Sequence, residues 1–118
     1  MIFDEGSFRD PAGSVFYHRN KVYRLINKSG ESRTDFIIKK NLLNKSVENN
    51  FFVNTKQLNS NQISSLGLKE NNIVFEHEKI PYISYPYEWS FSQLKAAAIH
   101  HIDFHLFLLN QGATLVDA

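Results

Sequence analysis

The feature that most constrains this chain is a long helix predicted near its C-terminal end. Ser90 is followed three residues later by Gln93, and this capping-box pattern indicates a helix start. Gly112 is suited to end the helix, because glycine readily adopts the left-handed backbone needed there. A helix from Phe91 to Asn110 would span roughly 30 Å at about 1.5 Å per residue. The rest of a 118-residue chain must fold around this element.

Large apolar groups surround most of the predicted helix. With residues spaced at helical intervals, one stripe contains Leu94, Ala98, His101, His105 and Leu108, and Ile99, Ile102, Leu106 and Leu109 lie beside it. A helix of this kind is normally covered on several sides. The preceding residues include many Asn and Ser and supply little cover. We therefore expect partner surface, either from further polypeptide or from a second copy in a homo-oligomer that buries the Leu94–Leu108 stripe.

The residues before the long helix predict short strands and short helices. Two β-type runs with a polar three-residue connection indicate a hairpin. Later apolar runs indicate further strands, and Thr34 and Ser60 are positioned as helix N-caps. The predicted strands are Ser14–Tyr17, Lys21–Ile26, Phe51–Val53 with a further extended run at Gln57–Leu58, and Ile73–Phe75. The predicted short helices are Asp35–Leu43 and Ser60–Leu66, the second ended by Gly67. Asn44–Asn50 is predicted as a polar break.

Two prolines shape the segment that joins these elements to the long helix. Pro81 and Pro86 exclude helix interior from Ile80–Tyr87, so we expect an extended aromatic connector. The predicted fold class is α+β: a small, mainly antiparallel sheet with short helices, followed by one long C-terminal helix. We expect one truncated domain, made of an α+β region at 1–79, a hinge-like connector at 80–90 and the helical segment at 91–118. The end of the chain at Val116–Ala118, without a polar tail, is typical of a cut within a larger protein.

Composition excludes several classes of function. The absence of Cys excludes disulfides, thiolate zinc sites and a cysteine nucleophile. No apolar run is long enough for a transmembrane helix, and Met1–Gly6 does not resemble a signal peptide, so a cytoplasmic location without membrane binding is expected. A formal net charge of +1 argues against a dedicated nucleic-acid binder. Aromatic and basic residues alternate in Phe16–Arg24, which suits base stacking, but a hairpin with one buried aromatic face explains them better.

Motifs for chemistry are sparse. The chain contains no G-x-S-x-G, G-x-G-x-x-G or P-loop sequence. His101 and His105 have the helical spacing of two metal ligands but lack the H-E-x-x-H pattern, so we expect buried, hydrogen-bonded histidines and no metal. The aromatic strip Ile80–Leu94 fits two interpretations, an interface or a packed connector that attaches the helix to the sheet.

Three segments carry a family resemblance. They are Phe8–Phe16 with Val22–Arg24, the strip Ile80–Leu94, and Gly112–Ala118. The strip matches a long signature almost residue for residue. Together these segments resemble a bacterial family of class I SAM-dependent methyltransferases that includes nodulation-associated members. The resemblance implies that the methyltransferase domain and its S-adenosylmethionine follow this region, and that this chain holds no cofactor itself.

The resemblance also implies the front half of a protein-kinase-like fold. Asp117 would stand where a catalytic loop begins, after a long buried helix. The hairpin around Pro11–Gly13 would replace the Gly-rich loop, and Arg24 would take the strand position of the phosphate-binding Lys. Asp35–Leu43 would correspond to the regulatory helix, and Ile80–Trp89 to the hinge between lobes. One Gly instead of three, and Arg instead of Lys, mean that phosphotransfer is not implied.

These observations predict an auxiliary role within a methyltransferase-family protein. The region would recognise a substrate or partner, or position the methyltransferase domain, without catalysing a reaction alone. The alternatives are half of an atypical kinase-like nucleotide-binding domain and a plain protein-interaction module. The expected ligand-binding residues are Arg9, Asp10 and Arg24, the expected catalytic-loop residue is Asp117, and the expected interface residues are Tyr82, Tyr85, Tyr87, Trp89 and Phe91.

Overall fold

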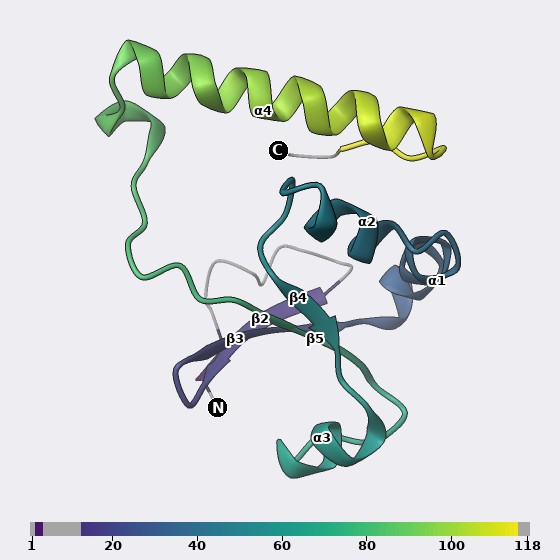
Figure 1. Ribbon diagram of the computed structural model, residues 1–118. Helices are drawn as coiled ribbons and strands as arrows, with labels where there is room; N and C mark the ends of the chain where they lie inside the picture. The colour runs from purple at the N-terminus through teal and green to yellow at the C-terminus, as the bar shows by residue number, and fades with distance from the viewer. Residues whose placement is uncertain (1, 4–12, 116–118) are drawn as a thin grey trace.

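A computed structural model describes residues 2–3 and 13–115 (Figure 1). Its sheet has the strand order β1-β2-β3-β5-β4, and every neighbouring pair is antiparallel. The strands are β1 (Ile2–Phe3), β2 (Gly13–His18), β3 (Lys21–Ile26), β4 (Thr55–Gln57) and β5 (Ile73–His77). The helices are η2 (Lys28–Gly30), α1 (Glu31–Lys39), α2 (Leu42–Glu48), α3 (Ser60–Ser65), η3 (Pro86–Glu88) and α4 (Phe91–Asn110). The predicted α+β class with a long C-terminal helix is confirmed.

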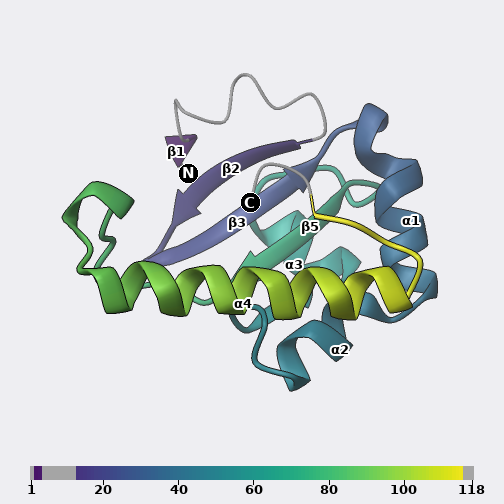
Figure 2. The ribbon, with the colours of Figure 1, turned by 90° about the horizontal axis from the view of Figure 1, so that it is seen from above.

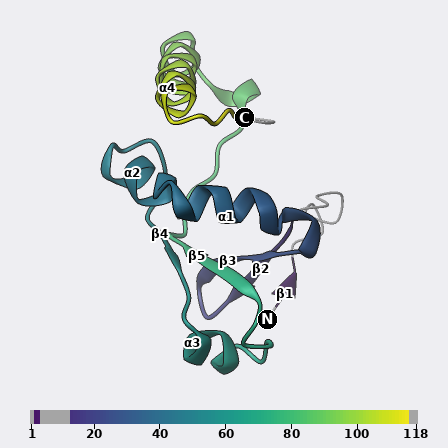
Figure 3. The same ribbon diagram turned by 90° about the vertical axis from the view of Figure 1, so that its right-hand side faces the viewer.

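The helices form layers on both sides of the sheet. Figure 3 shows α3 on one side, while α1 and α2 lie on the other side, between the sheet and α4. Figures 1 and 2 show that the N-terminal part of α4 extends beyond α2. The connector from β5 joins α4 at this end. The two sheet faces therefore have different neighbours, and α4 is the outermost element on the α1–α2 side.

The β2–β3 hairpin forms as predicted but has a tighter turn. Arg19 and Asn20 both have positive φ, 47° and 66°, and His18 pairs with Lys21. Two such residues in succession match the right-handed twist of the flanking strands, as in type I′ turns. The connection has two residues rather than the predicted three, and His18 belongs to β2.

The predicted helix Asp35–Leu43 is wrong at both ends. Thr34, predicted as its N-cap, lies inside α1, where its hydroxyl donates a hydrogen bond of 2.9 Å to the Gly30 carbonyl oxygen. The helix then ends near Asn41, which adopts a left-handed conformation with φ of 55° that asparagine tolerates well. A second helix, α2, begins at the buried Leu42 and occupies most of the predicted polar break. Burial of Leu42 outweighs the polar composition of that segment.

Two further boundaries also differ from the predictions. The strand predicted at Phe51–Val53 does not form there; β4 lies at Thr55–Gln57 and overlaps the predicted extended run Gln57–Leu58 at Gln57. The α3 helix is capped by Asn59 rather than Ser60, through reciprocal hydrogen bonds with Gln62. Gly67 has a φ of +80° after this helix, as its predicted role as a stop requires.

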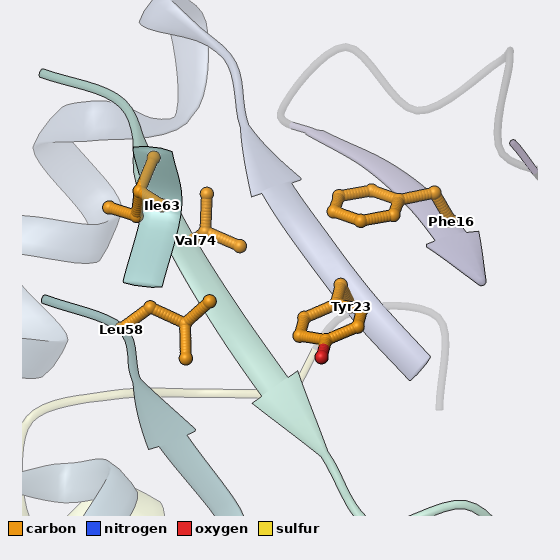
Figure 4. Close-up of a cluster of buried hydrophobic side chains, with 5 residues drawn as sticks. All are labelled: Phe16, Tyr23, Leu58, Ile63 and Val74. Carbon is orange, nitrogen blue, oxygen red and sulfur yellow. The ribbon is translucent and has the colours of Figure 1, made fainter. Parts of the chain in front are cut away.

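The main core lies between the sheet and α3. Phe16, Tyr23 and Val74 project from neighbouring strands toward Leu58 and Ile63 (Figure 4). The rings of Phe16 and Tyr23 stack at 5.1 Å between centroids. Both aromatic residues are buried, so they are not available to stack on nucleobases. The interpretation of Phe16–Arg24 as an ordinary hairpin with a buried aromatic face is confirmed.

Helix α4 has both predicted ends. The Ser90 side chain accepts a hydrogen bond from the Gln93 amide, and the Gln93 side chain accepts one from the Ser90 amide. At the other end, the Ala113 amide donates to the Leu108 carbonyl and the Gly112 amide to that of Leu109. This pair of bonds is the Schellman arrangement, and Gly112 has the positive φ that it needs.

We predict that Gly13→Ala destabilises the fold. A Cβ at Gly13 would lie 2.6 Å from the Leu25 carbonyl oxygen, an atom of the neighbouring strand that cannot move without disturbing the β2–β3 ladder. The free energy of unfolding should fall by about 1–3 kcal/mol, measured by urea denaturation. Gly67→Ala is the control, because nothing lies within 4 Å and only left-handed strain is added. A smaller loss for Gly13→Ala than for Gly67→Ala would contradict the steric argument.

Candidate functional site

The expected polar site is only partly within the described residues. Arg9, Asp10 and Asp117 lie outside them. Arg24 lies on β3 opposite Phe75 of β5, on the sheet face that α1 and α2 cover. Its side chain runs beside the start of β2, since a Cβ at Gly13 would be 3.6 Å from the Cγ and Nη1 atoms of Arg24. The positive charge of Arg24 also acts on His77, which lies on the same face of the sheet, and contributes to lowering its pKa.

His77, which the sequence did not single out, has a defined hydrogen-bonding state. The Thr55 hydroxyl donates its one proton to the Val53 carbonyl at 2.9 Å. At the 2.9 Å contact between Thr55 Oγ1 and His77 Nδ1, the hydroxyl oxygen must therefore accept, and Nδ1 carries a hydrogen. Burial and the positive charge of Arg24 lower the pKa of His77. In its neutral form the ring then has an unprotonated Nε2.

We predict that His77 makes stability depend on pH. The pKa of His77 is lowered from its usual 6.5, so the unfolded chain binds more protons at mildly acidic pH. The stabilisation is present above about pH 6.5 and is lost as the pH falls below it. Urea unfolding between about pH 7.5 and pH 5.5 should show this slope, and His77→Asn should reduce it while keeping a donor toward Thr55.

The control for this prediction is His101→Asn, which alters an exposed histidine and leaves His77 in place. That variant should keep the slope that belongs to His77. A nuclear magnetic resonance titration in which the His77 ring protonates at or above pH 6.5 would contradict the prediction.

The aromatic connector is exposed rather than packed against the sheet. Tyr87 retains 84% of its accessible surface, and Tyr82 and Tyr85 are also exposed. The strip is ordered by its own contacts: the Trp89 indole donates to the Ser84 hydroxyl at 2.8 Å, and the rings of Tyr85 and Tyr87 stack at 5.8 Å between centroids. The interpretation of the strip as a connector packed against the sheet is therefore wrong for these tyrosines, and the interface interpretation stays a prediction.

One side of α4 attaches to the rest of the molecule through Phe51. The Phe51 ring contacts Phe104 and Phe107 at 5.2 and 5.3 Å between centroids. The Phe51 carbonyl oxygen accepts a hydrogen bond of 3.2 Å from His100 Nε2. Leu108 is buried on the same side. The packed side of α4 is therefore defined by residues of its C-terminal half.

The opposite side of α4 is an apolar surface open to solvent. Its large apolar residues are Phe91, Leu94, Ile99, Ile102, Leu106 and Leu109, here called the outer face. Phe91 retains 82% of its accessible surface, and the others retain between 44% and 55%. This differs from the predicted Leu94–Leu108 stripe, because Leu108 turns inward against the protein. An apolar surface of this extent, continuous along the chain with the aromatic connector, is typical of an interaction site.

The histidines of α4 do not follow the prediction. His101 is exposed and His105 is half-buried, with their rings stacked at 6.3 Å between centroids. The buried Nδ1 of His105 has no hydrogen-bond partner among the described residues. His100 is the one that bonds to the backbone of another segment. Within residues 2–3 and 13–115, no group of three His, Asp or Glu side chains is arranged to hold a metal ion, and no helix there suits a membrane span.

We predict that the isolated chain self-associates through the outer face. Ile102→Glu places a charge at the centre of this face and should weaken association at least about tenfold, because charged groups lose their hydration when buried. Sedimentation velocity or light scattering over a concentration series measures the effect. Ala96→Glu, an exposed position on the polar side of α4, is the matched control. A chain that stays monomeric at several hundred micromolar would contradict the prediction.

Comparison with known proteins shows similarity to a longer protein. The chain is 35% identical over 115 residues to the nodulation protein NoeA of Rhizobium meliloti strain 1021. The match covers 96% of this chain but 23% of NoeA, so the chain spans less than a quarter of that relative. No family model matches the chain, and no solved structure matches it. The expected similarity to a nodulation-associated protein is thereby confirmed.

Proposed function

We propose that this chain is an auxiliary region of a larger protein of the SAM-dependent methyltransferase family. In that protein it recognises a substrate or partner, or positions the methyltransferase domain, and it does not transfer the methyl group itself. The observation that carries the proposal is the alignment of 96% of this chain with 23% of a longer nodulation protein. The three segments that resemble the methyltransferase family, with the strip Ile80–Leu94 foremost, support the assignment.

The exposed surfaces support a docking role. Tyr87 lies near the end of the connector, and Phe91 is the first residue of α4. Both side chains project almost fully into solvent. Aromatic side chains in such positions contribute large contact areas with little loss of conformational entropy. We infer that the following polypeptide covers the connector and the outer face. S-adenosylmethionine would then bind in that following domain, which agrees with the absence of a Gly-rich dinucleotide or P-loop motif from this sequence.

A second candidate function is nucleotide binding around Arg24. Arg24 lies on the sheet face covered by α1, in the relation that the kinase-like resemblance implies for the phosphate-binding strand residue and the regulatory helix. The guanidinium also lies beside the start of β2. This arrangement supports a site for the phosphates of ATP in the longer protein, without phosphotransfer.

One experiment tests both candidates. Calorimetry measures the binding of S-adenosylmethionine and of ATP to this chain, to a longer form that carries the following domain, and to the longer form with Arg24→Ala. The auxiliary role predicts that S-adenosylmethionine binds the longer form alone and that Arg24→Ala does not change its affinity. The nucleotide site predicts a component of ATP binding that Arg24→Ala abolishes.

Other outcomes would remove these proposals. If the longer form does not bind S-adenosylmethionine, the methyltransferase assignment fails. If this chain alone binds S-adenosylmethionine, the proposal that it is only an auxiliary region fails. If Arg24→Ala leaves ATP affinity unchanged, or if no ATP binds, the nucleotide site is absent. Lys28→Ala, which removes a cationic side chain from η2, is the control for loss of positive charge.

A further inference from the structure

A cluster of basic side chains gathers at one end of the sheet, where β3 and β4 begin and β5 ends. Lys21 starts β3, Lys56 lies in β4, and Lys79 follows β5. The positive-φ turn of the hairpin brings Arg19 and Asn20 to the same end. Three segments that are distant in the sequence thus each supply an ammonium group to one place.

Glu76 holds two of these ammonium groups in position. Lys21 Nζ lies 3.1 Å and Lys56 Nζ lies 3.8 Å from the same oxygen, Oε1 of Glu76. The Glu76 side chain is mostly buried, with 16% of its surface exposed, whereas both lysines are more than half exposed. The hydrogen bond and the negative charge of Glu76 raise the pKa of Lys21, so this group stays protonated. One carboxylate shared between two ammonium groups leaves positive charge uncompensated.

The third ammonium group is held by a neutral partner. Lys79 Nζ donates a hydrogen bond of 3.2 Å to Asn20 Oδ1 in the hairpin turn. This contact orients the side chain without neutralising its charge. Because Asn20 directly precedes Lys21, it also brings Lys79 toward the pair on Glu76.

These groups surround a cavity of about 410 Å³. Its lining combines the three lysines with Glu76, Glu78, His77, Thr55, Asn54 and Val47. The volume lies within the range of small-ligand sites, and the cavity is open to solvent. Three lysines outnumber the two carboxylates of Glu76 and Glu78 in this lining, and Glu76 is already engaged with Lys21 and Lys56. The charge therefore favours an anion.

We propose that this cavity binds the phosphoryl group of a small phosphorylated ligand through Lys21, Lys56 and Lys79. Ammonium groups that approach from three segments suit a tetrahedral oxyanion, because each can contact a different oxygen, and lysine binds phosphate as a point charge. Glu76 acts as a positioning residue that keeps Lys21 and Lys56 together. The site is separate from the Arg24 site considered above, and it does not depend on the methyltransferase assignment.

The test uses this chain with pyrophosphate, inorganic phosphate, ATP and adenosine as probes at low ionic strength. Calorimetry and amide chemical shifts should report binding of pyrophosphate and ATP and no binding of adenosine. The shifts should centre on Asn54, Thr55 and His77, which line the cavity. Binding of free phosphate and pyrophosphate as strong as that of ATP would identify a site for the phosphoryl group alone. Tighter binding of ATP than of pyrophosphate would identify a nucleotide as its source.

Paired variants test the residues. Lys56→Gln with Lys79→Gln should weaken pyrophosphate binding at least about tenfold, while Lys28→Gln with Lys69→Gln removes the same charge elsewhere and should change it little. Thermal melting confirms that each variant is folded. The amide shifts of the unaltered chain locate the bound probe independently of any variant. Equal loss from both pairs, no binding of any phosphate probe at about 10 mM, or binding of adenosine equal to that of ATP would each overturn the proposal.

Discussion

The contact of Phe51 with α4 determines how the outer part of this molecule is arranged. Phe51 lies between α2, which covers one face of the sheet, and β4, an edge strand of the sheet, and these two elements set its position. Its ring engages Phe104 and Phe107, and its carbonyl engages His100. Lys45 of α2 adds a hydrogen bond of 3.2 Å to Gln111 just beyond the helix. These contacts turn one side of α4 inward, and they thereby expose the outer face.

Side chains alternate along β5 between the two faces of the sheet, and at the end of the strand Glu76 and His77 both line the lysine-rich cavity. Val74 and Glu76 face the side of α3, where Val74 completes the core and Glu76 gathers two lysines. Phe75 and His77 face α1 and α2, beside Arg24. Successive residues of a strand point to opposite faces, so one short strand serves both regions. A shift of one residue in the β3–β5 register would place Glu76 in the position of His77 and destroy both arrangements.

Local signals in the sequence predicted the elements whose boundaries depend on local chemistry. The capping box at Ser90 and the glycine at 112 defined α4, because caps are satisfied within a few residues. The break at Asn41 was missed, because Leu42 starts α2 only when it is buried against distant residues. The contact between Thr55 and His77 was also missed, since 22 residues separate them and only the β4–β5 register unites them. Predicting the β4–β5 register from the alternation of apolar and polar residues in β5 would have revealed the contact between Thr55 and His77.

The outer face shows why helical periodicity alone could not identify the docking side of α4. Apolar residues surround most of this helix, so several stripes are equally apolar in sequence, and only the packing partner can choose among them. Phe51 is that partner, and it packs against the side of α4 that carries Phe104 and Leu108. The predicted stripe is divided as a result: Leu108 is buried, while Leu94 remains exposed with Ile102 and Leu109. The outer face remains apolar and exposed after the other side of α4 has packed, which supports the proposed second contact along the same 20 residues.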